Sequence, residues 1–264
     1  MTDDFDHSDD LALLKHAAAE AGRIAMGYFR KDPKISWKAG MSPVTEADLH
    51  VDRYLQAALM AARPHYGWLS EETEDDQSRL GKLRTFVVDP IDGTKAFIEG
   101  RDIWCVSIAV VENGRTLSGV LDCPARTEVF ESAKGSGSYL NGRLLAMAEP
   151  QAPLRVAGPK QFVTPFAGSV NRTVEMVGHV PSLAYRIAAI ACGQFDATFI
   201  KPDAHDWDLA AADLILAEAG GTLVNASGDR PAYAGAAVAH GVLVAGHDDL
   251  IAPMLGVVAQ TAIG

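Results

Sequence analysis

The segment D-P-I-D-G-T at residues 89–94 combines two carboxylates with a glycine and a threonine. It follows an apolar run at residues 85–88 that predicts a buried strand. Pro90 is expected to end this strand, and Gly93 permits a sharp turn with a close approach of the backbone. Residues 95–98 then favour a helical turn. Two carboxylates would therefore lie at the end of a strand, directly before the free N–H groups of a helix start.

The donor atoms of this segment indicate its chemistry. Hard divalent cations prefer carboxylate and carbonyl oxygens, and phosphate groups prefer backbone N–H groups at a helix start. Asp89 and Asp92 supply the carboxylates, and Gly93 and Thr94 supply the N–H groups. A lone D-x-x-D is most often a capped turn, but six specified residues in a row occur by chance on the order of once per ten million positions. The segment therefore predicts metal and phosphate chemistry.

Other polar residues are candidates for the same site. Glu71 and Glu72 belong to an acidic run, which is typical of a solvated surface. The apolar residues 68–69 before them favour the opposite interpretation, because they would draw the following acid toward the interior. His205 and Asp206 have no partners at metal-ligand spacing, and we expect them to shape a loop.

Two further acids belong to predicted helix starts. Asp48 lies in the first turn of a helix expected over residues 45–62, and Asp208 lies where a later helix is expected to begin. A structural role as a first-turn acid or an N-cap is sufficient to explain either residue. A carboxylate at a helix start is also well placed to face a cation, and Trp207 would shield Asp208 from water.

The hydrophobic pattern predicts helices and strands in both halves of the chain. Helices are expected over residues 8–31, 45–62 and 182–193, from about 208 to 220, and in a last segment ending near 261. Strands are expected over residues 86–88, 106–111, 117–121, 127–131, 197–200 and 241–245, and Asn-Gly pairs at 113–114 and 141–142 are typical of hairpin turns. A proline-containing segment at 149–153 divides the chain into residues 1–150, with most candidate ligands, and residues 151–264, with Asp208 and further substrate contacts.

Composition narrows the class of protein. The chain has 264 residues, of which 48% are hydrophobic and 22% charged, and its net charge is −11. Such an acidic surface argues against binding to a nucleic-acid polymer, whereas a divalent cation would still allow phosphate binding. The cysteines are too few and too scattered for a disulfide framework or a zinc site and are expected to pack as small hydrophobes; they are Cys105, Cys123 and Cys192.

The acidic N-terminus does not resemble a signal peptide, and no apolar run approaches the ~20 residues of a membrane helix. We therefore expect a soluble cytoplasmic protein without a membrane partner.

Several blocks together resemble the inositol monophosphatase family, and they follow the order and spacing of that family. They are D-P-I-D-G-T at 89–94, S-E-E at 70–72, T-E-A-D at 45–48, W-D-L-A-A-A-D at 207–213 and E-A-G-G at 218–221. The resemblance implies a layered αβαβα sugar-phosphatase fold of the α/β (α+β) class. It also implies a magnesium-dependent, usually dimeric and often lithium-inhibited phosphatase.

The same resemblance assigns roles to individual residues. Two or three Mg²⁺ ions would be held by Glu71, Asp89, the Ile91 carbonyl, Asp92 and Asp208. Thr94, with Asp48 behind it and Glu71 nearby, would orient and deprotonate the attacking water, and the Gly93 and Thr94 N–H groups would receive the phosphate. Lys38 occupies the place of a basic residue on the family's active-site flap, although a solvated loop lysine is an equal interpretation.

The sequence indicates the substrate less clearly than it indicates the metal ligands. Lys201 stands where the inositol branch commonly carries an acid, and a lysine cannot accept hydrogen bonds from a sugar. It would favour a second anionic group, unless it is only a solvated loop lysine. Lys95 after Thr94 is similar to bisphosphate nucleotidase and histidinol-phosphate phosphatase relatives, whereas Ala184 replaces a lysine that the nucleotidases often carry. Ala184 and Lys201 are the predicted substrate contacts.

These observations predict a Mg²⁺-dependent phosphomonoesterase that hydrolyses inositol 1-phosphate or a similar sugar or polyol phosphate. The alternatives are a 3′(2′),5′-bisphosphate nucleotidase and a histidinol-phosphate phosphatase. A non-enzymatic regulatory protein that keeps the fold would be expected to lack a metal carboxylate or Thr94, and both are present.

Overall fold

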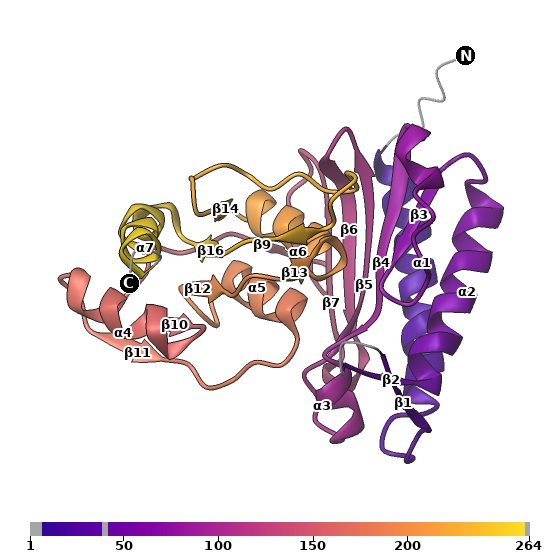
Figure 1. The fold of residues 1–264 in the computed structure, drawn as a ribbon, viewed down its shortest axis with the longest axis horizontal. Helices are drawn as coiled ribbons and strands as arrows, with labels where there is room; N and C mark the ends of the chain where they lie inside the picture. The colour runs from indigo at the N-terminus through magenta and orange to yellow at the C-terminus, as the bar shows by residue number, and fades with distance from the viewer. Residues whose placement is uncertain (1–6, 39–41, 262–264) are drawn as a thin grey trace.

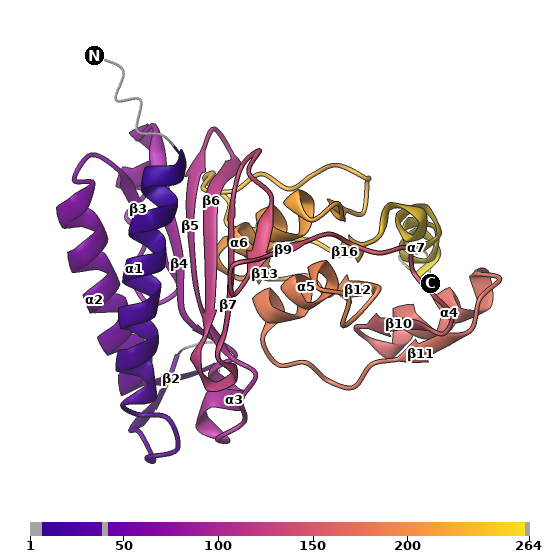
Figure 2. The ribbon, with the colours of Figure 1, turned by 180° about the vertical axis from the view of Figure 1, so that it is seen from behind.

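The structure is a computed structural model and describes residues 7–38 and 42–261. Helices and sheets alternate across the molecule in five layers, with two sheets between three pairs of helices (Figure 1). The view from behind shows the same succession, so the layering is not an effect of overlap in one projection (Figure 2). The predicted α/β class and αβαβα layering are confirmed.

The first layer consists of α1 (His7–Met26) and α2 (Glu46–Ala62), which pack on one face of the first sheet. The helix predicted over residues 45–62 is confirmed, with Thr45 as its N-cap. The first helix was predicted over residues 8–31, but α1 ends earlier, at Met26. The chain leaves the helix at Gly27, and Arg30 has a left-handed φ of 59°, which α-helical geometry excludes.

The second layer is a seven-stranded sheet in the order β3-β4-β5-β6-β7-β8-β9. Its strands are β3 (Gly67–Ser70), β4 (Arg84–Asp92), β5 (Cys105–Glu112), β6 (Arg115–Cys123), β7 (Glu128–Ala133), β8 (Ser138–Leu140) and β9 (Arg143–Leu145). β3 and β4 are parallel, and the other neighbours are antiparallel. The predicted strands of the first half overlap β4 to β7, and both Asn-Gly pairs form the expected hairpin turns with positive φ at both residues.

The end of β4 differs from the prediction that Pro90 would stop the strand. β4 continues through Pro90 to Asp92. Its pairing with β5 is regular as far as Asp89 and resumes at Asp92 opposite Cys105, with an irregularity between them. Such a bulge accommodates a proline, which has no N–H to donate, and it also re-aims the side chains around it. Both carboxylates of the motif therefore belong to the strand itself.

The third layer consists of α5 (Leu183–Ala191) and α6 (Asp206–Glu218), buried between the two sheets. α6 begins two residues before the predicted start because His205 and Asp208 form a capping box, in which Asp208 Oδ2 accepts the His205 N–H at 2.7 Å. The loop role predicted for Asp206 is also wrong. Asp206 is the first helical residue, and its buried carboxylate accepts the Ala234 N–H at 2.6 Å and contacts His240.

The fourth layer is a five-stranded sheet in the order β11-β10-β12-β16-β14. Its strands are β10 (Leu154–Ala157), β11 (Val174–Met176), β12 (Ala197–Ile200), β14 (Thr222–Asn225) and β16 (Leu243–Gly246). The fifth layer, α4 (Lys160–Ser169) and α7 (Asp248–Thr261), shares a buried apolar cluster with this sheet. The prediction of a strand over 197–200 is confirmed, as is the last helix to residue 261.

The remaining elements are short and lie around the sheet ends. They are the hairpin of β1 (Ile35–Trp37) and β2 (Pro43–Thr45), the helical turn α3 (Thr94–Ile98), the pair β13 (Ala204–His205) and β15 (Ala239–His240), and 3₁₀ turns at Ser78–Gly81 and Pro124–Arg126. No helix among the described residues is long and apolar enough to cross a membrane. Every strand of the first sheet precedes residues 149–153 in the chain, and every strand of the second sheet follows them. However, α6 belongs to the second half of the chain and packs on the first sheet. The division into 1–150 and 151–264 therefore stays a prediction.

Candidate active site

Three carboxylates from two distant segments meet in one cavity. Asp89 and Asp92 come from the end of β4, and Asp208 comes from the first turn of α6. One oxygen atom of each lies within 4.8 Å of the other two. Oxygens that bind one Mg²⁺ ion at about 2.1 Å lie within about 4.2 Å of one another. The three side chains therefore fit a divalent cation after a small contraction.

Burial and mutual repulsion act on these carboxylates. Burial, with the charges of Glu71 and the neighbouring aspartates, raises the pKa of Asp89 well above its ordinary value. Burial raises the pKa of Asp92 to about 6, although hydrogen bonds from the start of α5 oppose that shift. Burial and the charge of Asp92 raise the pKa of Asp208 in the same direction. Carboxylates held this close remain ionised only when cations neutralise them, which is the electrostatic environment of a metal site.

Asp92 is fixed by the start of α5, a segment 90 positions further along the chain. Its Oδ2 accepts the Ser182 hydroxyl at 2.6 Å and the Ala184 N–H at 2.7 Å, and its Oδ1 accepts the Leu183 N–H at 3.3 Å. Ala184 was predicted as a substrate contact, and the structure differs. Its methyl group is completely buried and does not line the cavity, so the residue serves Asp92 through its backbone.

Thr94 and Asp48 form the second part of the site. Thr94 Oγ1 lies 3.2 Å from Asp48 Oδ1 and 3.0 Å from the Ile91 carbonyl oxygen. A capping box at the start of α2 orients Asp48, because the Thr45 N–H and hydroxyl both donate to Asp48 Oδ2. Burial raises the pKa of Asp48 to about 6, against these hydrogen bonds from Thr45. A hydroxyl that donates to a carboxylate can accept a proton from a third group, so the pair can carry a proton away from the cavity.

Gly93 makes the turn between the two parts of the site. Its φ of 96° lies in the left-handed region, and a Cβ at this position would lie 3.1 Å from the Ile103 carbonyl oxygen and 3.2 Å from Ser182 Cβ. Any side chain would therefore be strained and crowded here. Gly93 and Thr94 both line the cavity beside the carboxylates.

Lys38 joins the two glutamates that follow β3. Its Nζ donates to Glu71 Oε1 at 2.9 Å and to Glu72 Oε1 at 2.7 Å. Glu71 lines the cavity with the aspartates, and one quarter of its side chain, 25%, is exposed. Glu72 is more deeply placed, with 4% of its side chain exposed, and burial raises its pKa to about 7. Of the two interpretations of this acidic pair, the inward one is therefore confirmed.

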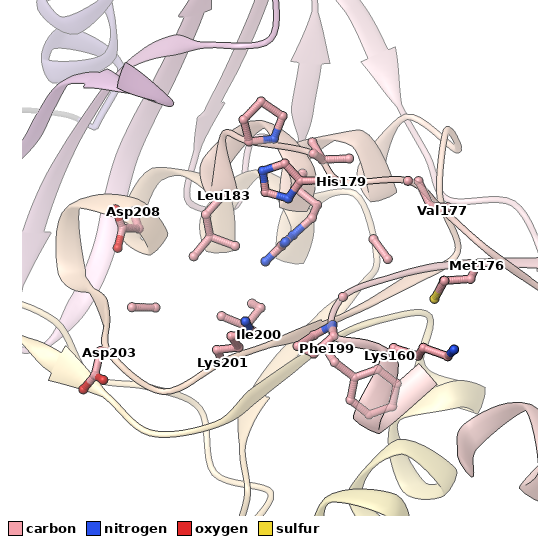
Figure 3. Close-up of a pocket in the computed structure, with 18 of the residues that line it drawn as sticks. Lys160, Met176, Val177, His179, Leu183, Phe199, Ile200, Lys201, Asp203 and Asp208 are labelled. Carbon is pink, nitrogen blue, oxygen red and sulfur yellow. The ribbon is translucent and has the colours of Figure 1, made fainter. Parts of the chain in front are cut away.

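The cavity has two adjoining parts. The part that contains the carboxylates and Thr94 has a volume of about 320 Å³. A larger part of about 580 Å³ lies between α5 and β12 and shares four lining residues with it, namely Asp92, His179, Pro181 and Asp208. Figure 3 shows Asp208 at one end of this larger part and Met176 and Lys160 at the other. A substrate of several ångströms therefore has room to extend away from the carboxylates.

Lys201 lies on the wall formed by the end of β12, opposite His179 and Leu183 (Figure 3). Its side chain is exposed, and it lines the larger part of the cavity as a substrate contact would. The role predicted for it stays a prediction.

Residues 6–258 match the sequence profile of the inositol monophosphatase family. The chain belongs to this family. An inositol-1-monophosphatase from Rhizobium meliloti is 32% identical over 244 residues, which are 86% of this chain and 90% of that protein. A histidinol-phosphatase from Mycobacterium tuberculosis is 31% identical over 260 residues, covering 92% of this chain and 96% of that protein. The solved IMPase of Thermotoga maritima has a TM-score of 0.79 at 25% identity, over 96% of this chain and 99% of that chain.

Membership in the inositol monophosphatase family places the protein among the phosphoric monoester hydrolases. Two features of this family member were not predicted from its sequence. Ser182 was predicted only as an N-cap, whereas its hydroxyl also binds Asp92. Arg186 was not singled out, although it lines the larger part of the cavity. A single charge in the otherwise apolar helix L-A-Y-R-I-A-A-I-A was the signal that could have revealed it.

Proposed function

We propose that the protein is a Mg²⁺-dependent phosphomonoesterase that acts on a small phosphorylated metabolite, with sugar and polyol phosphates such as inositol 1-phosphate as the leading class. The observation that supports this is the meeting of Asp89, Asp92 and Asp208 beside the hydrogen-bonded pair of Thr94 and Asp48. A metal-ligand set next to a proton acceptor is what hydrolysis of a phosphate ester by water requires.

The proposed ligands of two or three ions are Glu71, Asp89, the Ile91 carbonyl, Asp92 and Asp208. Bound Mg²⁺ would neutralise the carboxylates, polarise the phosphoryl oxygens and lower the pKa of a nearby water. Thr94 Oγ1 would orient the attacking water and take its proton while passing its own proton to Asp48. The pKa of Asp48, raised to about 6 by burial, suits a group that accepts a proton near neutral pH.

The phosphate would be held from the other side by backbone groups. Gly93 is the N-cap of α3 and Thr94 is its first residue, and the first turn of a helix leaves N–H donors without helical partners. Donors fixed in this way stabilise negative charge without reorganising during the reaction. In this arrangement the scissile phosphorus would lie between the Thr94 hydroxyl and the carboxylates, and the rest of the substrate would extend into the larger part of the cavity.

Two other substrates belong to the same proposal as alternatives, namely a 3′(2′),5′-bisphosphate nucleotide and histidinol phosphate. Lys201 in the cavity supports the first, and the histidinol-phosphatase relative supports the second. The non-enzymatic alternative is the least supported, because every proposed ligand and Thr94 are present. A homodimer, a cytoplasmic location and inhibition by lithium complete the proposal on the strength of family resemblance.

Phosphate release measured in excess Mg²⁺, and again in EDTA, tests the proposal. The panel is inositol 1-phosphate, fructose 1,6-bisphosphate, adenosine 3′,5′-bisphosphate and histidinol phosphate. Mg²⁺-dependent release from at least one compound is expected. A folded protein that binds Mg²⁺ and releases phosphate from none of them would overturn the assignment to these substrates.

A further inference from the structure

Arg186 brings a positive charge to the cavity and has no hydrogen-bond or ion-pair partner for its guanidinium among the described residues. It lies on α5 and lines the larger part of the cavity, and its Nε is buried without a hydrogen-bond partner. No ion pair or hydrogen bond of its guanidinium occurs among residues 7–38 and 42–261. Burial lowers the pKa of this guanidinium, opposed by the charge of Asp92. Buried charges are normally paired, so an unpaired one that faces a cavity indicates a ligand of opposite charge.

The position of Arg186 relates it directly to the proposed metal site. It stands four residues after Ser182, whose hydroxyl binds Asp92. Ser182 is the N-cap of α5 and Arg186 lies in the first turn that follows, close enough to Asp92 for the charge of that carboxylate to act on the guanidinium. Arg186 therefore lies roughly one helical turn from the carboxylates, on the wall that the non-reacting part of a substrate would contact.

The surroundings of Arg186 are basic, although the whole chain has a net charge of −11. Lys160, Lys201 and His179 line the same part of the cavity, and no ion pair of theirs occurs in the described part of the chain. The acids of this lining are Asp92, Asp203 and Asp208, two of which are proposed metal ligands. Once cations neutralise those two, the carboxylate of Asp203 remains against the positive charges of Arg186, Lys160 and Lys201.

We propose that Arg186 binds a second anionic group of the substrate, a phosphate or a carboxylate, so that the preferred substrates are phosphomonoesters carrying that group near the scissile phosphate. This inference rests on the proposed function, and within the small phosphorylated metabolites it favours doubly anionic compounds over inositol 1-phosphate. A guanidinium presents parallel N–H donors that match two oxygens of either group, and Lys201 would add charge from the opposite wall. Histidinol phosphate, which carries an ammonium group, is expected to be a poor substrate for the same reason.

Matched substrate pairs test the inference. The pairs are fructose 1,6-bisphosphate with fructose 1-phosphate, adenosine 3′,5′-bisphosphate with adenosine 3′-phosphate, and 2-phosphoglycerate with glycerol 2-phosphate. For at least one pair, the wild type should favour the doubly anionic member in kcat/KM by about tenfold or more, as expected for charge-assisted hydrogen bonds. Arg186→Gln should lower this ratio by about tenfold, and Arg186→Lys should give an intermediate ratio because it keeps the charge and loses the fork.

The ratio is the informative quantity, because a folding defect or a weaker metal site changes both members of a pair alike. Arg172→Gln, at an exposed arginine outside the cavity, is the matched control and should leave every ratio unchanged. Equal kcat/KM within all pairs for the wild type, or ratios that Arg186→Gln does not move, would overturn the inference while leaving the phosphatase proposal in place.

If the protein releases no phosphate from any compound, binding measurements test the inference about Arg186 instead. Calorimetric titration of the same pairs in Mg²⁺ should then show tighter binding of the doubly anionic member, lost in Arg186→Gln. Equal binding would overturn the inference. The absence of turnover would count against the proposed function alone, so the two failures are distinguishable.

Discussion

The Thr94 hydroxyl lies 3.2 Å from Asp48 Oδ1, and the two residues are 46 positions apart in the chain. The position of each residue is fixed by the helix to which it belongs. Thr94 is the first residue of α3, and Asp48 is the third residue of α2, held by the Thr45 capping box. Because α2 and β4 pack in adjacent layers, two short helix starts meet at the end of one strand. A proton acceptor is thereby placed beside the carboxylates by residues that all belong to helix starts or to the end of a strand.

Removing the hydroxyl should therefore stop proton transfer while preserving the fold. Thr94→Val keeps the shape of the side chain and is expected to lower kcat by about 10²–10⁴-fold, the range of general acid–base catalysis. Thr94→Ser keeps the hydroxyl and should retain activity within about tenfold of the wild type. Steady-state phosphate release measures both variants. Equal activity of the valine and serine variants would exclude Thr94 from proton transfer.

Asp92 has two tasks that a single substitution separates. Asp92→Asn keeps an acceptor oxygen for the start of α5 but removes the charge that a cation requires. We expect kcat to fall by about a thousandfold, since the loss of several kcal/mol of metal stabilisation corresponds to this factor. The far-UV circular dichroism should stay that of the wild type. Asp229→Asn, at an exposed carboxylate, is the matched control and should keep full activity. Near-normal turnover of Asp92→Asn would contradict the proposed metal role.

Metal binding should also be visible in stability. Ligands that bind only the folded state stabilise it by about 2.7 kcal/mol at a hundred times Kd, which raises the Tm of a protein of this size by about 5 °C. The sign of the pH dependence follows from Asp92, whose pKa burial raises to about 6. Without metal, the stability contributed by the protonated carboxylates is present at low pH and lost as pH rises through the folded pKa. Mg²⁺ binds the deprotonated form, so its effect on Tm should be larger at pH 8 than at pH 5.

Thermal unfolding in Mg²⁺ and in EDTA at the two pH values measures this difference. Na⁺ at equal ionic strength separates specific binding of Mg²⁺ from screening of the carboxylates. A Tm that is the same in Mg²⁺ and EDTA at pH 8 would mean that the aspartates do not form a metal site.

The parts of the fold that local sequence determines were predicted correctly. The strand over 197–200 and the helix over 45–62 agree with β12 and α2, because alternation, capping residues and apolar spacing act within each segment. The errors occur where tertiary contacts override local signals. Pro90 is tolerated inside β4 because the ladder bulges there, and α6 starts at Asp206 because His205 and Asp208 form a capping box.

The candidate site divides in the same way. The carboxylates and Thr94 were found because they lie in motifs of known order, and their meeting in one cavity follows from the fold. The contacts of Asp92 with Ser182 and of Lys38 with Glu72 were not predicted, because each depends on how separate segments dock. The same reason explains the error at Ala184, whose orientation is set by the contact of α5 with β4. Sequence spacing carries no information on such contacts.

Asp122 gives a test of the fold that is independent of the active site. Asp122 lies on β6 and packs against Gly22 of α1, where the Cβ of any larger residue would come within 2.2 Å of Asp122 Oδ2. In the described part of the chain, its carboxylate has no hydrogen-bond or ion-pair partner. Burial alone raises the pKa of Asp122 from 3.8 to about 6. Its protonated form therefore contributes stability below pH 4 that is lost as pH rises through 6, on the order of 3 kcal/mol for two pKa units.

Asp122→Asn removes this titration and keeps the shape of the side chain. Relative to the wild type, its free energy of unfolding in urea should increase between pH 4 and pH 8 by on the order of 3 kcal/mol, because only the wild type must bury a charge at the higher pH. Asp229→Asn, at an exposed carboxylate, should show no such change. A difference between Asp122→Asn and the wild type that is constant across this range would mean that Asp122 is hydrated or paired in the folded protein.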